Sequence, residues 1–301
     1  MREAVQRFYR TSRPIDHFHT SAQRRAFAPA IAGIITRLAP HINDMTVVDV
    51  GAGNGELLHH LYSLLPEDTA HLVAVEIRER PEHLPEAITW QDEPPEDTTG
   101  LLVACELLDN MPLDVAVATD QWRYQEITPN GDTRPGPPLT EADLQWIEKY
   151  WPHTDRVEIG RQRDQTWQQL VSTVSHGAAI AIDYGHTRAN RPHDTIASYR
   201  DGQQIPLTVD GTADLTAHVA VDSLGGDLLL PQREALLRCG LTGVLPPHAQ
   251  AHTDPMGYVH ALAQASEEAE LIDKSGLGKH WWVVNVRGID LELVLPVHQT
   301  G

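Results

Sequence analysis

The sequence is poor in cysteine and has no hydrophobic run long enough to cross a membrane. Its 301 residues contain only two cysteines, Cys105 and Cys239, which are too few for a disulfide framework and lack C-x-x-C spacing. A membrane helix needs roughly 18 or more consecutive apolar residues, and the N-terminus lacks the apolar stretch of a signal peptide. These absences predict a cytoplasmic protein with no membrane partner. Six arginines against two acids in the first 25 residues also leave an N-terminal transit peptide open.

Positive charge is scarce along the whole chain. Lysine and arginine total 23 against 42 aspartates and glutamates, which gives a formal net charge of −19. Because phosphate binding needs clustered basic residues, this balance argues against nucleic acid as a main partner. It permits a basic substrate, although a solvated acidic surface is the more common explanation. Hydrophobic residues make up 41% of the chain, which is typical of an ordinary globular protein.

Short apolar runs separated by helical or turn segments dominate the first two thirds of the chain. Several of these runs end in an acidic residue. Continuous apolar runs of this length indicate parallel strands buried on both faces, so the sequence predicts a doubly wound α/β core. The expected strands are 46–50, 71–76, 87–90, 100–105 and 178–183.

Other segments are expected to surround this core. An N-terminal segment, 1–45, would carry an amphipathic helix, and a catalytic core over 46–301 would carry insertions at about 113–176 and 186–230. Residues 128–139 are rich in proline and glycine and are expected to form a loop. Helices are expected at 22–40, 56–65, in two pieces within 140–176, at 231–239 and at 256–273. Further strands are expected at 280–286 and 291–297, whereas 186–227 lacks strong periodicity.

A glycine-rich turn follows the first expected strand directly and leads into a helix. It reads Asp49-Val-Gly-Ala-Gly-Asn-Gly55, and its glycines would let a ligand approach the backbone closely. The spacing is G-x-G-x-G and differs from the dinucleotide G-x-G-x-x-G. Asp49 lies where a carboxylate could meet a cationic amino-acid group. The turn therefore favours S-adenosylmethionine, which carries an ammonium and no pyrophosphate, over NAD.

Acidic residues follow the next two expected strands. Glu76 lies 21 residues after Gly55, close to the separation expected for the acid that accepts both ribose hydroxyl protons. Asp92 is a candidate for the adenine amino group, although Glu93, Glu96 and Asp97 lie nearby. The sequence therefore predicts that Glu76 binds the ribose.

The expected fourth strand ends in a second group of polar residues. Glu106, Asp109 and Asn110 follow Cys105 and would face the ligand crevice at the carboxyl edge of the sheet, where acids could alternatively stabilise a helix N-terminus. Asp183 and Tyr184 close the fifth strand, and the tyrosine could orient a substrate or bury its ring. His218 is either a base or a structural residue. The histidines lack the convergent spacing of a metal site, so no metal is expected.

Five segments, in order, resemble the MidA family of methyltransferases. They are Asp16-His-Phe-His-Thr-Ser21, the Asp49–Gly55 turn, Cys105-Glu-Leu-Leu-Asp-Asn-Met-Pro112, Ile182-Asp-Tyr-Gly185 and Asp210-Gly-Thr-Ala-Asp-Leu-Thr-Ala-His-Val219. The chain departs from the family pattern at Cys105, where an asparagine is usual, and at Ala197, where an arginine is expected before Tyr199. The departure at Cys105 puts the hydrogen bonding around the cofactor in question. The departure at Ala197 puts in question whether this chain shares the family's substrate.

This resemblance implies a Rossmann-like class I methyltransferase with a seven-stranded, mostly parallel sheet, which methylates arginine on a partner protein. Cofactor contacts are then expected from Thr20, Ser21, Asp49, Gly51, Ala52, Gly53, Gly55, Glu76, Ile77, Asp92 and Glu106. Substrate-side or catalytic parts are expected from Glu106, Asp109, Asn110, Asp183 and Tyr184. A guanidinium is a poor nucleophile, so carboxylates would hold and aim it.

Two other functions stay open. A small-molecule methyltransferase is favoured if residues 128–139 and 186–227 close a compact apolar pocket. An assembly factor that binds the cofactor without activity is compatible with the altered Cys105 and Ala197. The sequence identifies neither the substrate, nor the degree of methylation, nor the oligomeric state.

Overall fold

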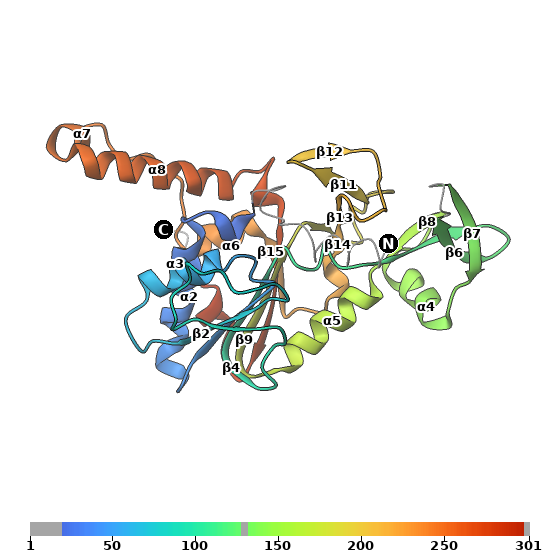
Figure 1. The fold of residues 1–301 in the computed structure, drawn as a ribbon, viewed down its shortest axis with the longest axis horizontal. Coiled ribbons are helices and arrows are strands. Elements are labelled where there is room, and N and C mark those ends of the chain that lie inside the picture. Colours follow the sequence, from blue (N-terminus) through green and yellow to red (C-terminus); the bar gives the residue numbers. More distant parts are fainter. Residues whose placement is uncertain (1–19, 128–131, 298–301) are drawn as a thin grey trace. The chain divides into compact units, whose positions relative to one another are not determined.

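The computed structural model describes residues 20–127 and 132–297, shown as a ribbon in Figure 1. Contacts between residues divide these into two compact units, which we describe separately. The core unit comprises residues 20–106, Leu170–Ile182 and 227–297, and the insert unit comprises Leu107–Gln169 and Asp183–Gly226. The domain boundaries expected from the sequence remain a prediction.

The core unit is built on a seven-stranded sheet with the order β15-β16-β9-β4-β1-β2-β3. Four neighbouring pairs, from β9 through β4, β1 and β2 to β3, are parallel, and β15 pairs antiparallel with β16. The predicted seven-stranded, mostly parallel sheet is thereby confirmed. Its strands are β1 (Thr46–Val50), β2 (His71–Val75), β3 (Thr89–Gln91), β4 (Thr98–Cys105), β9 (Val174–Asp183), β15 (Leu228–Pro231) and β16 (Trp281–Arg287).

Alternate residues of the central strands build one hydrophobic cluster with several helices. Residues such as Val47, Leu101 and Ile180 face this cluster because side chains alternate along a strand. The helices of the core unit are α2 (Phe27–Leu38), α3 (Glu56–Leu64), α6 (Gln232–Arg238), α7 (Gln250–Thr253), α8 (Pro255–Leu271) and α9 (Leu291–Val294). Short 3-10 turns lie at Ser21–Gln23, Ala39–His41 and Leu277–Lys279. Helices α2, α3, α6 and α9 all contribute to the cluster, so they cover the same face of the sheet.

The strand order reverses between β1 and β4. The chain runs outward from β1 to β2 and β3, and then returns so that β4 pairs with the other side of β1. In an open α/β sheet, ligands bind outside the carboxyl ends of the strands at this reversal. The turn after β1 and the residues after β2 and β4 therefore lie at the place where a ligand is expected.

Two glycines let β1, β4 and β9 approach each other closely. Gly100 pairs with Thr46 on one side and with Gly177 on the other, and both have positive φ, at 142° and 127°. A Cβ atom on Gly177 would lie 1.9 Å from the carbonyl oxygen of Gly100. No side-chain motion relieves such a contact, because the opposing atom belongs to the backbone.

We therefore expect Gly177→Ala to destabilise the core unit by about 2–6 kcal/mol, from backbone strain and overpacking together. The melting temperature should fall by about 4 °C or more, measured by circular dichroism. Gly33→Ala is the matched control, because its added Cβ lies inside α2 and meets only the end of the Arg37 side chain at 3.4 Å. That control should be neutral or stabilising by up to about 1 kcal/mol. Equal melting temperatures for Gly177→Ala and the native chain would contradict the close-approach argument.

The insert unit contains a four-stranded antiparallel sheet with the order β7-β6-β5-β8. Its strands are β5 (Asp114–Ala118), β6 (Trp122–Ile127), β7 (Thr133–Pro138) and β8 (Arg156–Ile159). Helix α4 (Glu141–Tyr150) packs Trp146 and Ile147 into a small core with Trp151 and Val157. Helix α5 (Arg161–Ser172) begins in this unit and leads into the core unit.

Several short strands complete the insert unit. Strand β10 (Gly185–His186) pairs in parallel with β14 (Val219–Ala220), and a 3-10 turn, Val221–Ser223, follows. Strand β11 (Ala197–Arg200) lies between β12 (Gln203–Ile205) and β13 (Asp214–Thr216). The segment that lacked periodicity in the sequence thus folds through short pairings between its own parts.

The two helices expected within 140–176 are confirmed as α4 and α5, with the unexpected strand β8 between them. Two other expectations from the sequence are wrong. Residues 133–138 form a strand paired with β6, although the proline- and glycine-rich segment was expected to be a loop; residues 128–131 lie outside the described ranges. The last expected strand, 291–297, begins instead as helix α9, whose Val294 is buried and whose carbonyl oxygens accept hydrogen bonds from Arg37.

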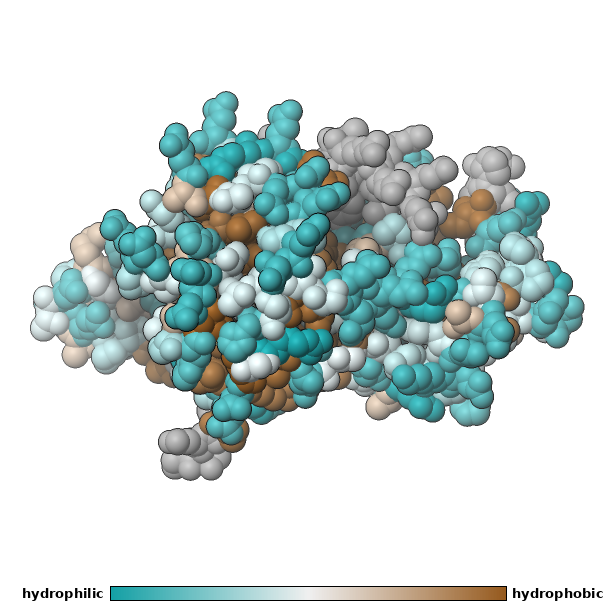
Figure 2. Space-filling view, turned by 90° about the horizontal axis from the view of Figure 1, so that it is seen from below, coloured by the Kyte–Doolittle hydropathy of each residue, from teal (hydrophilic) through white to brown (hydrophobic). Residues whose placement is uncertain are grey.

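Within residues 20–127 and 132–297, none of the helices combines the length and the apolar character that a membrane span requires. The cytoplasmic location stays a prediction. Figure 2 shows one face of the molecule, on which hydrophilic residues predominate and hydrophobic residues show in smaller areas between them. This distribution agrees with a solvated acidic surface.

Candidate active site

The expected site residues fall into two sets. The cofactor residues from Thr20 to Glu106 lie in the core unit, and Asp109, Asn110, Asp183 and Tyr184 lie in the insert unit. Each set is built from the carboxyl end of a buried strand and the residues that follow it. We describe the contacts within each unit in turn.

The glycine turn after β1 is fixed to the end of β2 by its own backbone. The N–H groups of Gly51 and Ala52 donate to the carbonyl oxygen of Val75, at 2.9 and 3.3 Å. Gly51, Gly53 and Gly55 all have positive φ, at 75°, 64° and 77°, before α3 begins at Glu56. Since L side chains rarely adopt this conformation, glycine is needed for the turn, and the backbone at Gly53 is left open to a ligand.

Asp49 lies beneath this turn and is 3% exposed. Burial, together with the neighbouring carboxylates Glu56 and Glu76, raises the pKa of its carboxyl group to about 7. A cation that approached this group would stabilise the carboxylate. The position therefore fits the ammonium of an amino-acid moiety.

We expect cofactor binding to depend on pH through Asp49. Because the pKa of the free protein is raised to about 7, the group is partly protonated at neutral pH, and binding a cation lowers that pKa and releases a proton. The affinity for S-adenosyl-homocysteine should thus rise from pH 6 to pH 8, by up to about tenfold per unit below the pKa, and then level off. Calorimetry in buffers of different ionisation enthalpy measures the proton release, and Asp49→Asn should remove it. Affinity independent of pH in the native chain would contradict this role.

Glu76 follows β2 and faces the glycine turn. Its Oε2 accepts a hydrogen bond from the N–H of Gly53 at 3.1 Å and a second from Arg78 Nη2, also at 3.1 Å. Ile77 is largely exposed beside it, which leaves its side chain available to an adenine ring. Asp92 directly follows β3 and is exposed. The ribose, adenine and Ile77 assignments remain predictions that this arrangement allows.

Glu106 stands at the end of β4 with an unusual backbone. Its φ is 54°, a conformation that costs a non-glycine residue about 1–3 kcal/mol and is held only where surrounding contacts enforce it. The Glu106 N–H donates to the Ile182 carbonyl oxygen at 2.7 Å, and its Oε1 accepts from the Ser21 N–H at 2.7 Å. His280 Nδ1 lies 3.7 Å from the same Oε1. These contacts aim the carboxylate and hold the strained backbone.

Ser21 is fully buried, and its contacts are internal. Gln232 Nε2 donates to its hydroxyl at 3.1 Å and also to the carbonyl oxygen of Leu277. The backbone N–H of Ser21 donates a hydrogen bond to Oε1 of Glu106. Ser21 therefore positions Glu106, and its expected contact with the cofactor remains a prediction. Thr20 precedes it and is partly exposed, whereas residues 16–19 of the expected N-terminal motif lie outside the described residues.

In the insert unit, Asp183 and Asp109 form a carboxyl pair. Asp183 is buried, and its two oxygens accept the N–H groups of Leu108 and Asp109 at 3.0 and 3.1 Å. Burial and the Asp109 carboxylate raise the pKa of Asp183 well above its ordinary value. Asp183 is enclosed and holds the 108–109 backbone in place, and its expected direct part in catalysis remains a prediction. Asp109 Oδ2 accepts a hydrogen bond from the Thr216 hydroxyl at 2.8 Å.

Arg163 fixes the segment that carries Asp109. This arginine lies on α5, is almost fully buried, and donates five hydrogen bonds of 2.7–3.1 Å, all to backbone carbonyl oxygens. The acceptors belong to Asp109, Met111, Ala217 and His218. Burial lowers the pKa of its guanidinium, and the Asp109 and Asp183 carboxylates oppose that shift. Arg163 therefore ties two distant segments together. Asn110 lies between two of the acceptors and is partly buried; its catalytic part remains a prediction.

Tyr184 presents an aromatic ring next to this pair. The side chain is 40% exposed, so the alternative that the ring is buried is wrong. His218 packs edge-on against it, with ring centroids 4.1 Å apart. Burial lowers the pKa of His218, so its imidazole is neutral at neutral pH. Tyr184 is therefore partly accessible at the end of β9.

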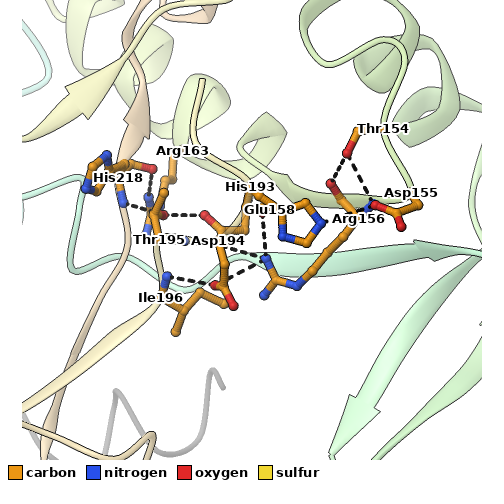
Figure 3. A network of polar contacts seen from close by, with 10 residues as sticks. All are labelled: Thr154, Asp155, Arg156, Glu158, Arg163, His193, Asp194, Thr195, Ile196 and His218. Atoms are coloured by element: carbon orange, nitrogen blue, oxygen red, sulfur yellow. Dashed lines mark hydrogen bonds and ion pairs between the residues drawn. The ribbon is translucent and has the colours of Figure 1, made fainter. Parts of the chain in front are cut away.

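Figure 3 shows the polar network that extends from His218 to Thr195, Glu158 and Arg156. Glu158 accepts hydrogen bonds from the Thr195 N–H and from Arg156, both at 2.9 Å, and from the Thr195 hydroxyl. Burial opposes ionisation of Glu158, but these bonds outweigh it and keep its pKa below the ordinary value. The Thr195 hydroxyl oxygen in turn accepts the His218 N–H at 2.9 Å. The network fixes the backbone on which His218 stands.

Sequence reasoning missed Arg78, His280, Glu158 and Arg163. Arg163 and His280 have partners far away in the chain, whereas Arg78 lies two residues from the recognised Glu76 and Glu158 lies two residues from Arg156. Cys105 is buried in the core cluster, and Ala197 lies in β11 opposite Thr216. Neither departure from the resembled family disrupts the strand that contains it.

The residues of the core unit fit S-adenosylmethionine. The buried Asp49 suits its ammonium, the open backbone at Gly53 suits close approach, and Glu76 suits a ribose diol. No group of three or more histidine, cysteine, aspartate or glutamate side chains within the described ranges could hold a metal ion.

A family model described as "Putative S-adenosyl-L-methionine-dependent methyltransferase" matches residues 27–226. Two solved structures from Burkholderia thailandensis resemble the whole chain. One, in complex with S-adenosyl-homocysteine, is 22% identical with a TM-score of 0.75, covering 95% of this chain and 82% of the other. The second, a native crystal structure, is 21% identical with a TM-score of 0.77, covering 100% and 89%.

These similarities identify the fold as that of a Rossmann-like class I methyltransferase. Comparison with curated proteins gives no match.

Proposed function

This chain belongs to the family of S-adenosylmethionine-dependent methyltransferases whose model spans residues 27–226, and from that premise we propose that it methylates an arginine side chain on a partner protein. S-adenosylmethionine is its cofactor. The observation that carries the arginine assignment is the Asp109–Asp183 carboxyl pair followed directly by the exposed ring of Tyr184. Carboxylates and aromatic faces are the two groups that recognise a planar guanidinium.

The proposed part of each residue follows from its surroundings. S-adenosylmethionine supplies an electrophilic methyl group on its sulfonium. Asp109 is held by Arg163 and Asp183 through its backbone, so its carboxylate can hold a guanidinium nitrogen without moving. Tyr184 would stack on the guanidinium plane. As the new N–C bond forms and the C–S bond breaks, the nitrogen's proton passes to solvent or to a carboxylate, and the neutral thioether leaves.

The acidic character of the chain supports a basic partner. A net charge of −19 favours encounter with a positively charged protein through long-range attraction, which salt screens. The small-molecule alternative depended on residues 128–139 acting as a pocket-closing loop. Residues 133–138 instead form strand β7, which pairs with β6. This part of the expected pocket-closing loop is therefore not a loop.

Labelled methyl transfer tests the proposal. The native chain would be incubated with methyl-labelled S-adenosylmethionine and a lysate of its source, and the labelled protein hydrolysed to identify the methylated residue. We expect label on arginine, and about ten- to a hundredfold less of it when Glu76→Ala replaces the native chain at limiting cofactor.

Three outcomes would contradict the proposal in different ways. Label on lysine or on a metabolite would replace the substrate class. Cofactor binding with no transfer to any lysate component would favour the assembly-factor alternative. Undiminished label with Glu76→Ala under these conditions would point to a contaminating enzyme.

A further inference from the structure

The carboxylate of Glu76 already has most of its acceptor positions filled. Oε2 accepts from the Gly53 N–H and from Arg78 Nη2, both at 3.1 Å, and Oε1 accepts from the Arg78 backbone N–H at 3.2 Å. Each carboxylate oxygen offers about two lone pairs. Oε2 is therefore saturated, and Oε1 has one position left.

A ribose diol needs two acceptor positions on this carboxylate, because the 2′- and 3′-hydroxyls each donate one hydrogen bond. One of the three donors must therefore leave before both hydroxyls can bind. The Arg78 backbone N–H lies only two residues from Glu76 on the same segment, so it stays. The Gly53 N–H belongs to a turn anchored on Val75, so it stays. The Arg78 guanidinium lies on a flexible side chain that is 20% exposed, so it is the donor that can leave.

The guanidinium also lies over the glycine turn. A Cβ atom built on Gly53 would stand 3.9 Å from Arg78 Nη2 and 3.5 Å from Glu56 Oε2. Gly53 has no side chain to fill the space in front of the turn. Arg78 borders this space.

We propose that Arg78 is a competing cation that closes the ribose acceptor Glu76 in the cofactor-free enzyme and withdraws from Oε2 when the nucleoside binds. Arg78 acts through Glu76 and sets the affinity of the cofactor site. A partly exposed ion pair contributes little, so the competition should reduce nucleoside affinity by about two- to fivefold. The inference concerns cofactor binding, so it does not depend on which residue accepts the methyl group.

5′-Methylthioadenosine is the sharpest probe, because it carries the ribose and adenine without the charged amino-acid group. We expect Arg78→Met to bind it about two- to fivefold more tightly than the native chain, measured by calorimetry. In the native chain the affinity should rise by a similar factor between about 0.05 and 0.5 M salt, since salt screens the Arg78–Glu76 pair. The Arg78→Met affinity should not change over this range.

Two further variants separate the competition from other effects. Arg123→Met removes the same charge from a partly exposed ion pair in the insert unit and should leave the affinity unchanged. Glu76→Ala should weaken binding by about ten- to a hundredfold, and adding Arg78→Met to it should give no gain. If Arg78 had only a structural role, the gain in affinity from Arg78→Met would not depend on the presence of Glu76.

Several results would overturn the proposal. Weaker binding by Arg78→Met would mean that Arg78 holds Glu76 in its productive orientation or contacts the nucleoside. An unchanged affinity would mean that no competition exists, and an equal gain in the Glu76→Ala background would mean that Arg78 acts independently of Glu76. Failure of the native chain to bind the probe would overturn the ribose assignment itself. None of these results bears on arginine as the methyl acceptor, which the labelling experiment tests separately.

Discussion

Gly53→Val is expected to lower the affinity for S-adenosyl-homocysteine below detection while the chain stays folded. Valine is β-branched and is strained at the φ of 64° that this position adopts, so the turn must shift. A shift breaks the hydrogen bond from the Gly53 N–H to Glu76, and the new side chain fills the space between the turn and the Glu76–Arg78 pair. Calorimetric titration measures the loss, and circular dichroism shows that the fold persists.

Gly240→Val is the matched control for backbone strain. Gly240 also has positive φ, at 93°, but a Cβ atom there would meet nothing within 4 Å, and the position follows α6. Both variants should lose about 1–3 kcal/mol of stability from strain. Only Gly53→Val should lose cofactor binding. Detectable binding by Gly53→Val, or equal loss in the control, would show that the turn has no special part in the cofactor site.

Asp109→Asn is expected to slow methyl transfer by about ten- to a thousandfold, which corresponds to roughly 1.4–4 kcal/mol of transition-state stabilisation. The amide keeps the size of the side chain and an acceptor for the Thr216 hydroxyl, but it removes the charge that strengthens a bond to guanidinium. Cofactor affinity should stay within about threefold. The measurement is single-turnover transfer to the arginine substrate found by labelling, with cofactor binding measured in parallel.

Thr216→Val separates charge from local structure. It removes the hydroxyl that donates to Asp109 Oδ2 and leaves the carboxylate in place. If Asp109 acts through its charge, Thr216→Val should slow transfer far less than Asp109→Asn. Equal losses would assign Asp109 to the fold of the insert unit, and a parallel loss of cofactor affinity would place it in the cofactor site.

The core sheet was predictable because its strands are buried on both faces. Strands such as β1, β4 and β9 are nearly continuous apolar runs, and this pattern survives in the sequence without knowledge of partners. The glycine turn was recognisable for a related reason, since positive φ at three alternate positions demands glycine.

The antiparallel sheet of the insert unit was not predictable by the same signals. Its strands are partly exposed, and β7 reads Thr-Arg-Pro-Gly-Pro-Pro, a composition that normally marks a loop. Strand β7 lies at the edge of its sheet, where proline is tolerated because one side of the strand needs no hydrogen bonds. Pairing with β6 thus overrides the local preference.

The supporting residues of the site were hidden by distance along the chain. Arg163 binds carbonyl oxygens more than 50 residues away, and Gln232 reaches Ser21 across 211 residues. No local pattern distinguishes such residues from surface arginines or glutamines. The burial of Ser21 and Asp183 was hidden too, because a short motif does not show which of its residues are enclosed.

The strand order has a consequence for synthesis on the ribosome. Strand β4 pairs with β1 on one side, but its other neighbour, β9, begins at Val174, about 70 residues after β4 ends at Cys105. Until β9 emerges, the nascent chain carries an apolar strand with an open hydrogen-bonding edge, which invites association with other chains. At about 5–20 residues per second this interval lasts several seconds. The order of the strands therefore means that this edge needs protection during translation.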